Sequence, residues 1–376
     1  MTERIRYHVP FRTGREDAYI AEALAQGTVS GNGPFTKRAH GALEALTSGA
    51  RVLLTHSCTA ALEMSAMLLD LEPGDEVIVP SFAFTSTAAA FLRAGATVRF
   101  AEVVPETMCL DPAHVSSLVG PKTRALVPIH YGGSPADLDA LRAAAPGVDL
   151  IEDAAQCIGA TLNGKALGTF GRFGTLSFHE TKNLHCGLGG ALIVNQASDT
   201  ERAEYVWERG TNRQQFFRGL VDKYTWVEVG SSFYPTELQA AFLLAQLEAE
   251  AENRDARTSI AAIYDRDIAP VARRAGALTP PKVAGARGNA HIWHLVLPTA
   301  EACENLRLGL AEQGIDAYTH YVPLHASPVG ARLGYRPEDL PVTCSAAERL
   351  LRLPLHTGMT PGDVARVVEA VNTLLA

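Results

Sequence analysis

Residues 177–183 read Ser-Phe-His-Glu-Thr-Lys-Asn, between a short apolar run and a cluster of glycines at 187, 189 and 190. Only six of the chain's 33 basic residues are lysines, so Lys182 is conspicuous at this place. Upstream, the run 148–153, Val-Asp-Leu-Ile-Glu-Asp, ends in the carboxylate of Asp153. An amine that can form a Schiff base and an acid that keeps a pyridine nitrogen protonated are what pyridoxal phosphate (PLP) requires. The two residues together therefore indicate a PLP site.

Short β-rich runs alternate with helical stretches around this pair. The expected strands are 52–55, 76–80, 97–103, 125–131, 149–153, 175–179 and 190–194, and the expected helices between the earlier strands are 59–71, 86–95, 112–118 and 135–145. Nearly continuous apolar strands alternating with helices predict an α/β fold with a mainly parallel seven-stranded sheet, covered on both faces. Ligands of such sheets bind beyond the carboxyl ends of the strands, where Asp153 and Lys182 fall.

A long helix is expected to begin at Pro235-Thr236. Thr236 and Gln239 have the spacing of a capping box, and the apolar pattern continues through Leu247 and as far as 264. We place a large cofactor-binding domain at 1–245 and a smaller C-terminal α/β domain at 246–376, because a chain of 376 residues is long for one core.

The composition limits the partners. A formal net charge of −8 provides no global attraction for nucleic acid or for an acidic membrane. The first residues lead into no apolar stretch, so we expect neither a secretory signal nor a membrane span. Six scattered cysteines without a CxxC pair are typical of free thiols, which favours a cytoplasmic protein.

The segment 55–63 is the candidate phosphate site. It follows a strand, opens a helix and carries Ser57 and Thr59, so backbone N–H groups at the helix start could bind an anion. The commoner role of such residues is helix capping. Phe84 could stack on a cofactor ring or belong to the core. For Asp153 the alternative is a helix cap or a turn, and for Lys182 an extended side chain at a strand edge.

Two further patterns suggest other sites but fit them poorly. Residues 159–165 match a phosphate-binding loop up to Lys165, but Ala166 occupies the place of the Mg²⁺-binding hydroxyl, and Asn163-Gly164 is typical of a hairpin turn. His179, His185 and Cys186 have no second ligand pair at zinc spacing. We therefore expect neither an NTPase nor a metal site.

Four short motifs resemble the DegT/DnrJ/EryC1/StrS family of PLP-dependent nucleotide-sugar aminotransferases. They are Ser-Phe-His-Glu-Thr-Lys-Asn at 177–183, Glu-Asp-Ala-Ala-Gln at 152–156, Pro-Ser-Phe-Ala-Phe at 80–84 and Ser-Cys-Thr-Ala-Ala at 57–61. The runs 210–219 and 221–226 resemble dTDP-4-keto-6-deoxy-D-glucose 4-aminotransferases most closely. The resemblance covers nearly the whole chain and implies a fold-type-I aminotransferase that works as a homodimer with shared active sites.

The resemblance also implies roles for single residues. Lys182 would form the Schiff base, Asp153 would hold the pyridine nitrogen, Gln156 would lie near the ring oxygen and Phe84 would stack on the ring. Cys58, Thr59 and Ser177 would hold the phosphate. The family often adds an asparagine of the partner subunit from a Gly-Tyr-Asn motif; this chain has Gly-Ser-Ser at 230–232, so Ser232 is the candidate replacement.

The implied substrates are glutamate and a dTDP-keto-sugar aminated at C4. The diphosphate requires local positive charge, and Arg213, Arg218 and Lys223 lie within eleven residues among aromatic side chains. A solvated basic loop is the alternative for this segment. Tyr321, with His320, and the segment 30–33 are further candidates for the sugar pocket. Two alternative functions are a 3-aminotransferase of a related sugar and a catalytically silent PLP-binding regulator.

Overall fold

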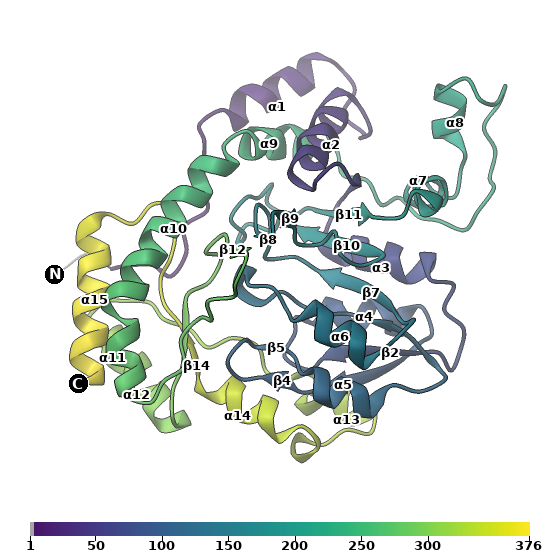
Figure 1. Ribbon diagram of the computed structural model, residues 1–376. Helices are drawn as coiled ribbons and strands as arrows, with labels where there is room; N and C mark the ends of the chain where they lie inside the picture. The colour runs from purple at the N-terminus through teal and green to yellow at the C-terminus, as the bar shows by residue number, and fades with distance from the viewer. Residues whose placement is uncertain (1–3) are drawn as a thin grey trace.

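A seven-stranded sheet in the order β1-β11-β10-β7-β6-β2-β3 forms the centre of the computed structural model, which describes residues 4–376 (Figure 1). Its strands are β1 Arg51–Thr55, β2 Glu76–Pro80, β3 Thr97–Ala101, β6 Thr123–Leu126, β7 Asp149–Asp153, β10 Phe173–Ser177 and β11 Gly190–Val194. Only β11 runs antiparallel to its neighbours in this sheet. The predicted mainly parallel seven-stranded sheet is therefore confirmed.

Three strand boundaries differ from the prediction, each for a local reason. The run 125–131 pairs regularly only up to Leu126, because Pro128 has no N–H to donate and Ile129 makes a single bridge to Asp153. The run 97–103 divides into β3 and a short hairpin of β4 Val103–Val104 with β5 Cys109–Leu110. The strand expected at 175–179 begins and ends two residues earlier.

Helices cover both faces of the sheet, as the apolar strands require. One face packs against α3 Cys58–Leu68, α4 Thr85–Arg93 and α7 Thr200–Trp207. The other packs against α2 Pro34–Leu46 and α9 Glu237–Leu247 at one end, and α5 Pro112–Leu118 and α6 Leu138–Ala144 at the other. Side chains of β1 alternate accordingly: Leu53 lies in the first core, whereas Val52 and Leu54 lie in the second.

The long helix expected from 235 to 264 is two helices, so that prediction was wrong. The capping box of Thr236 and Gln239 is present and starts α9, but the helix ends at Leu247, and α10 begins at Glu250. At the junction, Ala249 has φ −110° and ψ 16°, which is not a helical conformation. The change of direction carries α10 away from the sheet.

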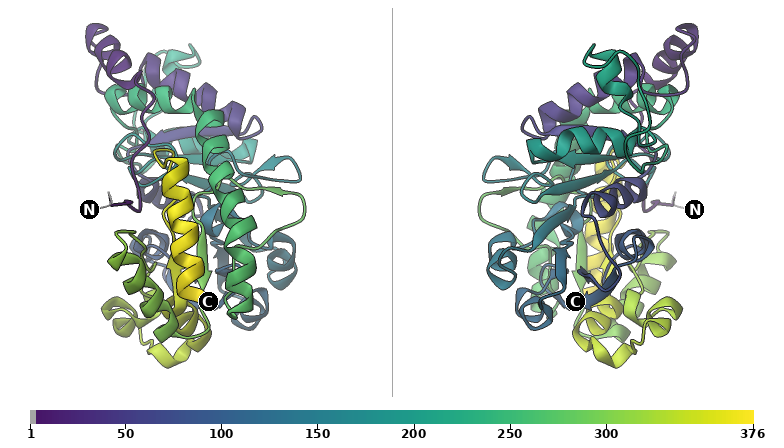
Figure 2. Two further views of the ribbon diagram at one scale, coloured as in Figure 1. Left: turned by 90° about the vertical axis from the view of Figure 1, so that its left-hand side faces the viewer. Right: turned by 90° about the vertical axis from the view of Figure 1, so that its right-hand side faces the viewer.

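A separate core lies beyond this junction. It gathers residues of α10 Glu250–Asp267, α11 Ala269–Arg274, α12 Ala300–Glu312 and α15 Pro361–Leu375, together with Ile5 from the N-terminal segment. Figure 2 shows α15 and α10 side by side in this part. A two-stranded sheet of β13 His294–Val296 and β14 Leu350–Arg352 crosses it. The division at 245/246 stays a prediction, and residues 1–3 of the proposed large domain lie outside the described residues.

The remaining elements are peripheral. They are α1 Glu16–Ala25, α8 Arg213–Phe217, α13 Pro328–Arg332, α14 Pro341–Arg349, β8 Thr161–Leu162, β9 Lys165–Ala166 and β12 Ala286–Arg287. β8 and β9 form a hairpin through Asn163 and Gly164, whose φ angles are 50° and 79°. Both positive angles suit a type I′ turn, so the predicted hairpin is confirmed in place of a phosphate-binding loop.

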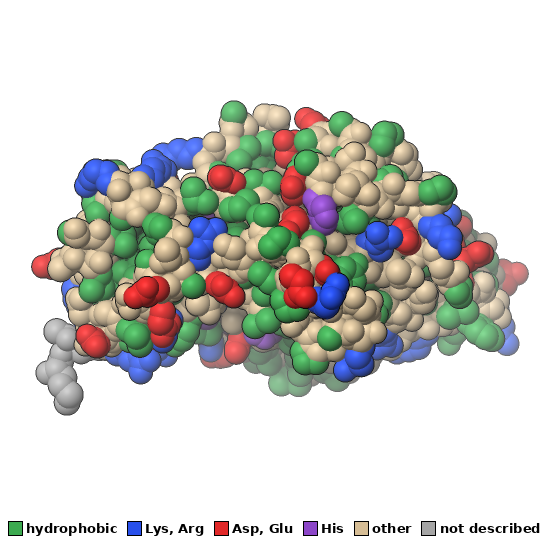
Figure 3. All heavy atoms as spheres, turned by 90° about the horizontal axis from the view of Figure 1, so that it is seen from below, with side chains coloured by type: hydrophobic (Ala, Val, Ile, Leu, Met, Phe, Trp, Pro, Cys, Tyr) green, Lys and Arg blue, Asp and Glu red, His purple; other side chains and the backbone are tan. Residues whose placement is uncertain are grey.

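Charges are dispersed on the surface. Figure 3 shows acidic and basic side chains interspersed on the face seen from below, without a large patch of one sign. Within residues 4–376, every helix is too short or too polar to cross a bilayer.

A buried carboxylate fixes the end of the central strand β7. Glu152 is fully buried and accepts hydrogen bonds from the N–H groups of Gly168, Phe170 and Gly171 at 2.9, 2.6 and 2.6 Å, and its Oε2 lies 2.8 Å from Nε2 of His130. Burial opposes ionisation, but the His130 and backbone donors outweigh it, so the pKa of Glu152 is lowered. Glu152 thereby anchors the loop that leads into β10.

We expect Glu152→Gln to lower the free energy of unfolding by roughly 2–4 kcal/mol at pH 7, because buried N–H groups lose a charged acceptor. A carboxylate with a lowered pKa stabilises the fold above its unfolded pKa, near about 4.3, and this contribution is lost as the pH falls. The difference in urea midpoint between wild type and variant should therefore shrink below about pH 4.3. The exposed Glu338→Gln serves as the control, and equal midpoints at pH 7 would contradict the assignment.

Candidate active site

The main cavity of the described residues lies beyond the carboxyl ends of the parallel strands and measures about 490 Å³. Its wall includes eight residues predicted from the sequence: Cys58, Thr59, Phe84, Asp153, Gln156, Ser177, Lys182 and Tyr321. They come from five separate segments of the chain. The sheet edge therefore assembles these residues at one place, as expected for parallel strands.

The start of α3 forms one end of the cavity. Ser57 is the N-cap residue, and its hydroxyl accepts a hydrogen bond from the N–H of Ala60 at 3.1 Å. The N–H groups of Cys58 and Thr59 in the first turn have no acceptor within the helix and are available to an anion. Thr59 Oγ1 lies 2.6 Å from the hydroxyl of Ser86. Ser57 is thus a cap, while the turn that it caps offers a phosphate site.

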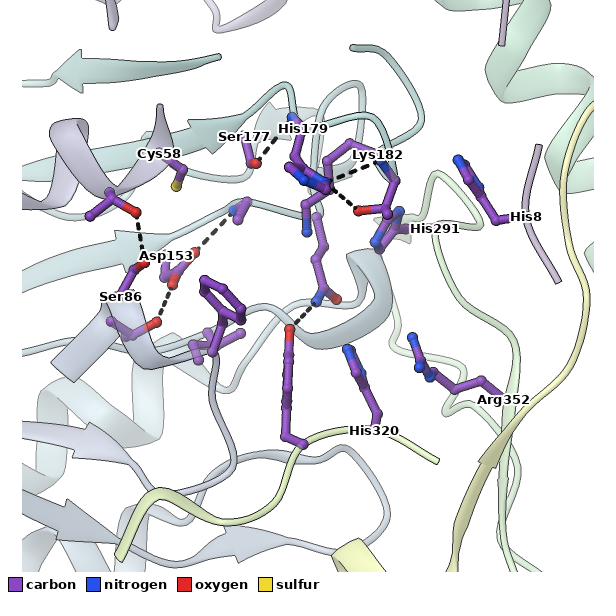
Figure 4. A pocket seen from close by; sticks show the side chains of 18 of the residues that line it. His8, Cys58, Ser86, Asp153, Ser177, His179, Lys182, His291, His320 and Arg352 are labelled. Carbon is purple, nitrogen blue, oxygen red and sulfur yellow. Dashed lines mark hydrogen bonds between the residues drawn. The ribbon is translucent and has the colours of Figure 1, made fainter. Parts of the chain in front are cut away.

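Asp153 ends β7 in the middle of the cavity wall and is only 6% exposed. Its Oδ2 accepts a hydrogen bond from the Thr87 hydroxyl at 2.8 Å, and its Oδ1 accepts one from the N–H of Ala155 at 3.2 Å. These two donors hold the carboxylate toward the cavity (Figure 4). A protonated ring nitrogen is the partner that would neutralise this buried charge.

Lys182 lies on the loop between β10 and β11, and its backbone N–H bonds to the carbonyl of His179 at 2.9 Å. Close packing explains why glycines follow Lys182 in the sequence. A side chain at Gly190 would collide with the Ser57–Cys58 backbone, and one at Gly189 would collide with the sulfur of Cys186. The glycines therefore bring the lysine loop against the start of α3.

The environment of Lys182 favours its neutral form. Burial is the main cause and lowers the pKa of the Lys182 amine, although the carboxylate of Asp153 opposes the shift; Arg352 lowers the pKa further. The thiol of Cys58 is neutral because burial raises its pKa. A neutral amine at this place can act as a nucleophile and can accept a proton.

Gln156 and Tyr321 meet across the cavity. The Gln156 amide donates to the Tyr321 hydroxyl at 3.4 Å and accepts from the N–H of Gly132 at 2.6 Å. Tyr321 has a φ of 41° and stacks on His320 at 3.6 Å between ring centroids. Phe84 is the N-cap residue of α4 and is 60% exposed, so it is not a core residue. An exposed ring on the cavity wall is suited to stacking on a ligand.

The opposite wall comes from distant parts of the chain that the sequence analysis did not identify. It contains Tyr7 and His8 of the N-terminal segment, Arg257 of α10, His291 and Arg352 at the end of β14. Arg352 interrupts an apolar run at 350–355, which was a usable signal. Arg257 lies in a helix rich in charges, so nothing in its surroundings distinguished it. The segment 30–33 does not line the cavity.

The four other predicted residues lie away from the cavity of their own chain. Figure 1 shows α8 and the following loop standing off the body. Arg213 on α8 pairs with the buried Glu208 at 3.0 Å, Arg218 pairs with the buried Glu204 at 2.6 Å, and Lys223 is exposed. Ser232 is exposed, and its backbone forms an isolated antiparallel β-bridge with Glu208. Because these four residues do not line the cavity of their own chain, their predicted roles require the cavity of another chain.

The cavity fits PLP. The α3 start offers N–H groups for a phosphate, Asp153 offers a buried acid for the ring nitrogen, and Lys182 offers an amine between them and the opposite wall (Figure 4). The start of α3, Asp153 and Lys182 would therefore each bind a different part of the cofactor.

Comparisons with known proteins agree with this chemistry. Residues 12–372 match the model of the DegT/DnrJ/EryC1/StrS aminotransferase family. A pleiotropic regulatory protein of Geobacillus stearothermophilus is 34% identical, with 83% of this chain and 81% of that protein covered. GDP-perosamine synthase of Caulobacter vibrioides is 29% identical, with 99% and 98% covered.

Among solved structures, the aminotransferase TlmJ from Streptoalloteichus hindustanus superposes with a TM-score of 0.89 at 30% identity, covering 99% of both chains. The fold is that of the fold-type-I PLP aminotransferases, as predicted. The chain belongs to the DegT/DnrJ/EryC1/StrS aminotransferase family, and its cofactor is pyridoxal phosphate.

Proposed function

We propose that this protein transfers an amino group from L-glutamate to C4 of dTDP-4-keto-6-deoxy-D-glucose and gives a dTDP-4-amino-4,6-dideoxyhexose. The observation that carries the reaction class is the cavity in which Lys182, Asp153 and the start of α3 meet. Family membership supports amino transfer to a sugar. The runs 210–219 and 221–226 support the choice of sugar nucleotide, since they resemble the dTDP-sugar 4-aminotransferases.

Residues at different positions along the cavity have different roles in the proposed reaction. PLP, when bound, supplies an electron sink for the carbon that exchanges its amine and proton. Asp153, held by Thr87 and Ala155, keeps the ring nitrogen protonated. The first turn of α3 binds the phosphate. The exposed ring of Phe84 would stack against the cofactor, and Gln156 would lie beside it, since both residues line the cavity.

Lys182 moves the proton. Burial lowers the pKa of its amine, which favours the unprotonated form that can take the proton from the donor carbon and return one to the neighbouring carbon. In the second half of the reaction the same amine works in the opposite direction on the sugar. One buried group that serves as base and then as acid contributes typically about 10²–10⁴-fold to the rate.

The nucleotide end of the site is proposed to come from a second copy of the chain. Arg213, Arg218 and Lys223 belong to α8 and the loop after it, a segment that stands off the body in Figure 1. Phe217, Leu220 and Trp226 of the same segment are 60, 68 and 74% exposed, an apolar surface that suits contact with another protein. In a homodimer this segment would bring its basic residues, and Ser232 nearby, to the partner's cavity.

Specific observations bear on two alternatives to the proposed function. One relative carries the name of a pleiotropic regulatory protein; for this chain the corresponding alternative is a PLP-binding regulator without catalysis. The intact pair of Lys182 and Asp153 favours an enzyme over that function. Amination at C3, or of a GDP-sugar as in the name of the perosamine synthase, keeps the same chemistry and changes only the pocket.

Incubation with dTDP-4-keto-6-deoxyglucose, glutamate and PLP tests the proposal. The expected product carries its amine at C4, read from proton couplings in the NMR spectrum, with 2-oxoglutarate formed in equal amount. An amine at C3, or turnover only with a GDP-sugar, would replace the proposed substrate. A holoprotein that never converts glutamate would favour the regulator.

Borohydride reduction of the holoprotein should join PLP to the Nζ of Lys182, as peptide mass mapping can establish. Lys182→Ala should abolish this label and lower amino transfer by at least about 10²-fold, since it removes both nucleophile and base. Lys165→Ala, which changes an exposed lysine of the β8–β9 hairpin, is the matched control. A label on Lys165 or on any other amine would overturn the assignment.

Arg218→Ala should lower kcat/KM for the dTDP-sugar at least about tenfold and leave kcat/KM for glutamate within about twofold, because the guanidinium would meet only the diphosphate. The two constants report separate half-reactions. Arg93→Ala, an exposed arginine of α4, is the control. Equal losses for both substrates would show that Arg218 acts only through its salt bridge to Glu204.

A further inference from the structure

Two arginines in the wall of the cavity have no carboxylate partner. Within residues 4–376, no aspartate or glutamate lies within 4 Å of the guanidinium groups of Arg257 or Arg352. The neighbouring Arg254, one turn earlier on α10, pairs with Glu250 at 2.7 Å. Because buried charges in proteins are normally paired, two unpaired guanidinium groups in one cavity indicate an anionic ligand.

Arg257 is the stronger of the two observations. It is 4% exposed, the only lysine or arginine of the described residues that is buried to this degree. Its Nε and Nη2 donate to the carbonyls of Ala290 and His291 at 3.0 and 2.8 Å, which fixes the side chain in place. Burial lowers its pKa to about 10, so the group is still a cation at neutral pH.

Arg352 is held in a similar way. Its Nη2 donates to the carbonyl of Thr319 at 2.8 Å, and its guanidinium carbon lies 4.8 Å from the centre of the Tyr7 ring. Figure 4 shows its guanidinium directed into the cavity, at the side opposite Cys58, with Asp153 and Lys182 between them. Both arginines act electrostatically on the Tyr7 hydroxyl, so Tyr7 lies close to both.

The described cavity wall has no negative charge left to neutralise Arg257 and Arg352. Asp153 is the only carboxylate in the described wall, and with PLP bound it would pair with the pyridine nitrogen. The cofactor phosphate belongs at the start of α3, at the other end of the cavity. His8, His291 and His320 are neutral because burial lowers their pKa values, that of His8 to about 4. The positive charge at this end therefore comes from Arg257 and Arg352.

We infer that Arg257 and Arg352 bind the two carboxylates of the amino donor and restrict the donor to a dicarboxylic amino acid. The inference rests on the proposed amino transfer but not on the identity of the sugar. A guanidinium fork matches a carboxylate, and two such groups match a donor with a second carboxylate. Alanine or glutamine would leave one of them without an anion.

The diphosphate of the sugar nucleotide is the other anion that could occupy this wall. Distance to the reacting atoms favours the donor. Its α-carboxylate is bonded to the carbon whose proton Lys182 moves, whereas the diphosphate is separated from the C4 carbonyl by the sugar ring. Arg352 lies close enough to Lys182 to act on the charge of its amine, which is where an α-carboxylate must lie.

The test measures binding of unreactive anions to the PLP-loaded protein by calorimetry. Glutarate carries both carboxylates without an amine, butyrate carries one, and dTDP carries the diphosphate. We expect wild type to bind glutarate at least about tenfold more tightly than butyrate, and Arg352→Gln to weaken glutarate roughly tenfold to hundredfold with dTDP unchanged. Arg352→Lys should recover part of the loss, because it keeps the charge but not the fork.

Arg349→Gln is the matched control, since Arg349 also donates to backbone carbonyls but lies outside the cavity wall. Arg257→Lys is the second variant, read by the same glutarate titration after its thermal midpoint confirms folding. Weaker dTDP binding with unchanged glutarate binding would assign the wall to the diphosphate and overturn the inference. Unchanged binding of both anions, or glutarate binding no tighter than butyrate, would also overturn it.

The same titration separates this inference from the proposed function. Glutarate binding that depends on Arg352, in a protein that does not aminate dTDP-4-keto-6-deoxyglucose, would retain the carboxylate site and reject the sugar. Amination of that sugar with glutarate binding independent of Arg352 would retain the sugar and reject the carboxylate site.

Discussion

The end of β7 is the point on which the rest of the site depends. Successive residues of a strand point to opposite faces, so Glu152 and Asp153, two adjacent acids, serve opposite sides of the sheet. Glu152 binds three N–H groups of the loop at 168–171, which leads into β10 and from there to Lys182. Asp153 binds Thr87 on α4 and faces the cavity. One strand end therefore positions both the acid and, through the loop, the amine.

The cavity is polarised along its length. The first turn of α3 offers hydrogen-bond donors to an anion at one end, a carboxylate lies at the centre, and two unpaired guanidinium groups lie at the other end. Low exposure strengthens each of these interactions, because water does not compete for them. Burial also lowers the pKa of the Lys182 amine, which favours the neutral form that accepts a proton.

Arginines in this chain fall into two groups with different uses. Arg213 and Arg218 are partly exposed and paired with the buried carboxylates of Glu208 and Glu204, so they hold the α8 segment to the body. Arg257 and Arg352 are fixed by backbone carbonyls, which do not neutralise charge. The second pair has no carboxylate partner among the described residues. Composition cannot distinguish the two pairs, because all four residues are arginines.

The amino-acid sequence by itself determined most of the sheet, the hairpin at Asn163-Gly164, the capping box at Thr236, and the presence of Asp153 at a strand end and of Lys182 beyond one. These features depend on local patterns: apolar periodicity, turn residues and cap spacing. Only the tertiary structure decided that α9 ends at Leu247 and that α10 and β14 bring Arg257 and Arg352 to the same cavity. Those outcomes depend on contacts between residues far apart in the chain, which no local pattern records.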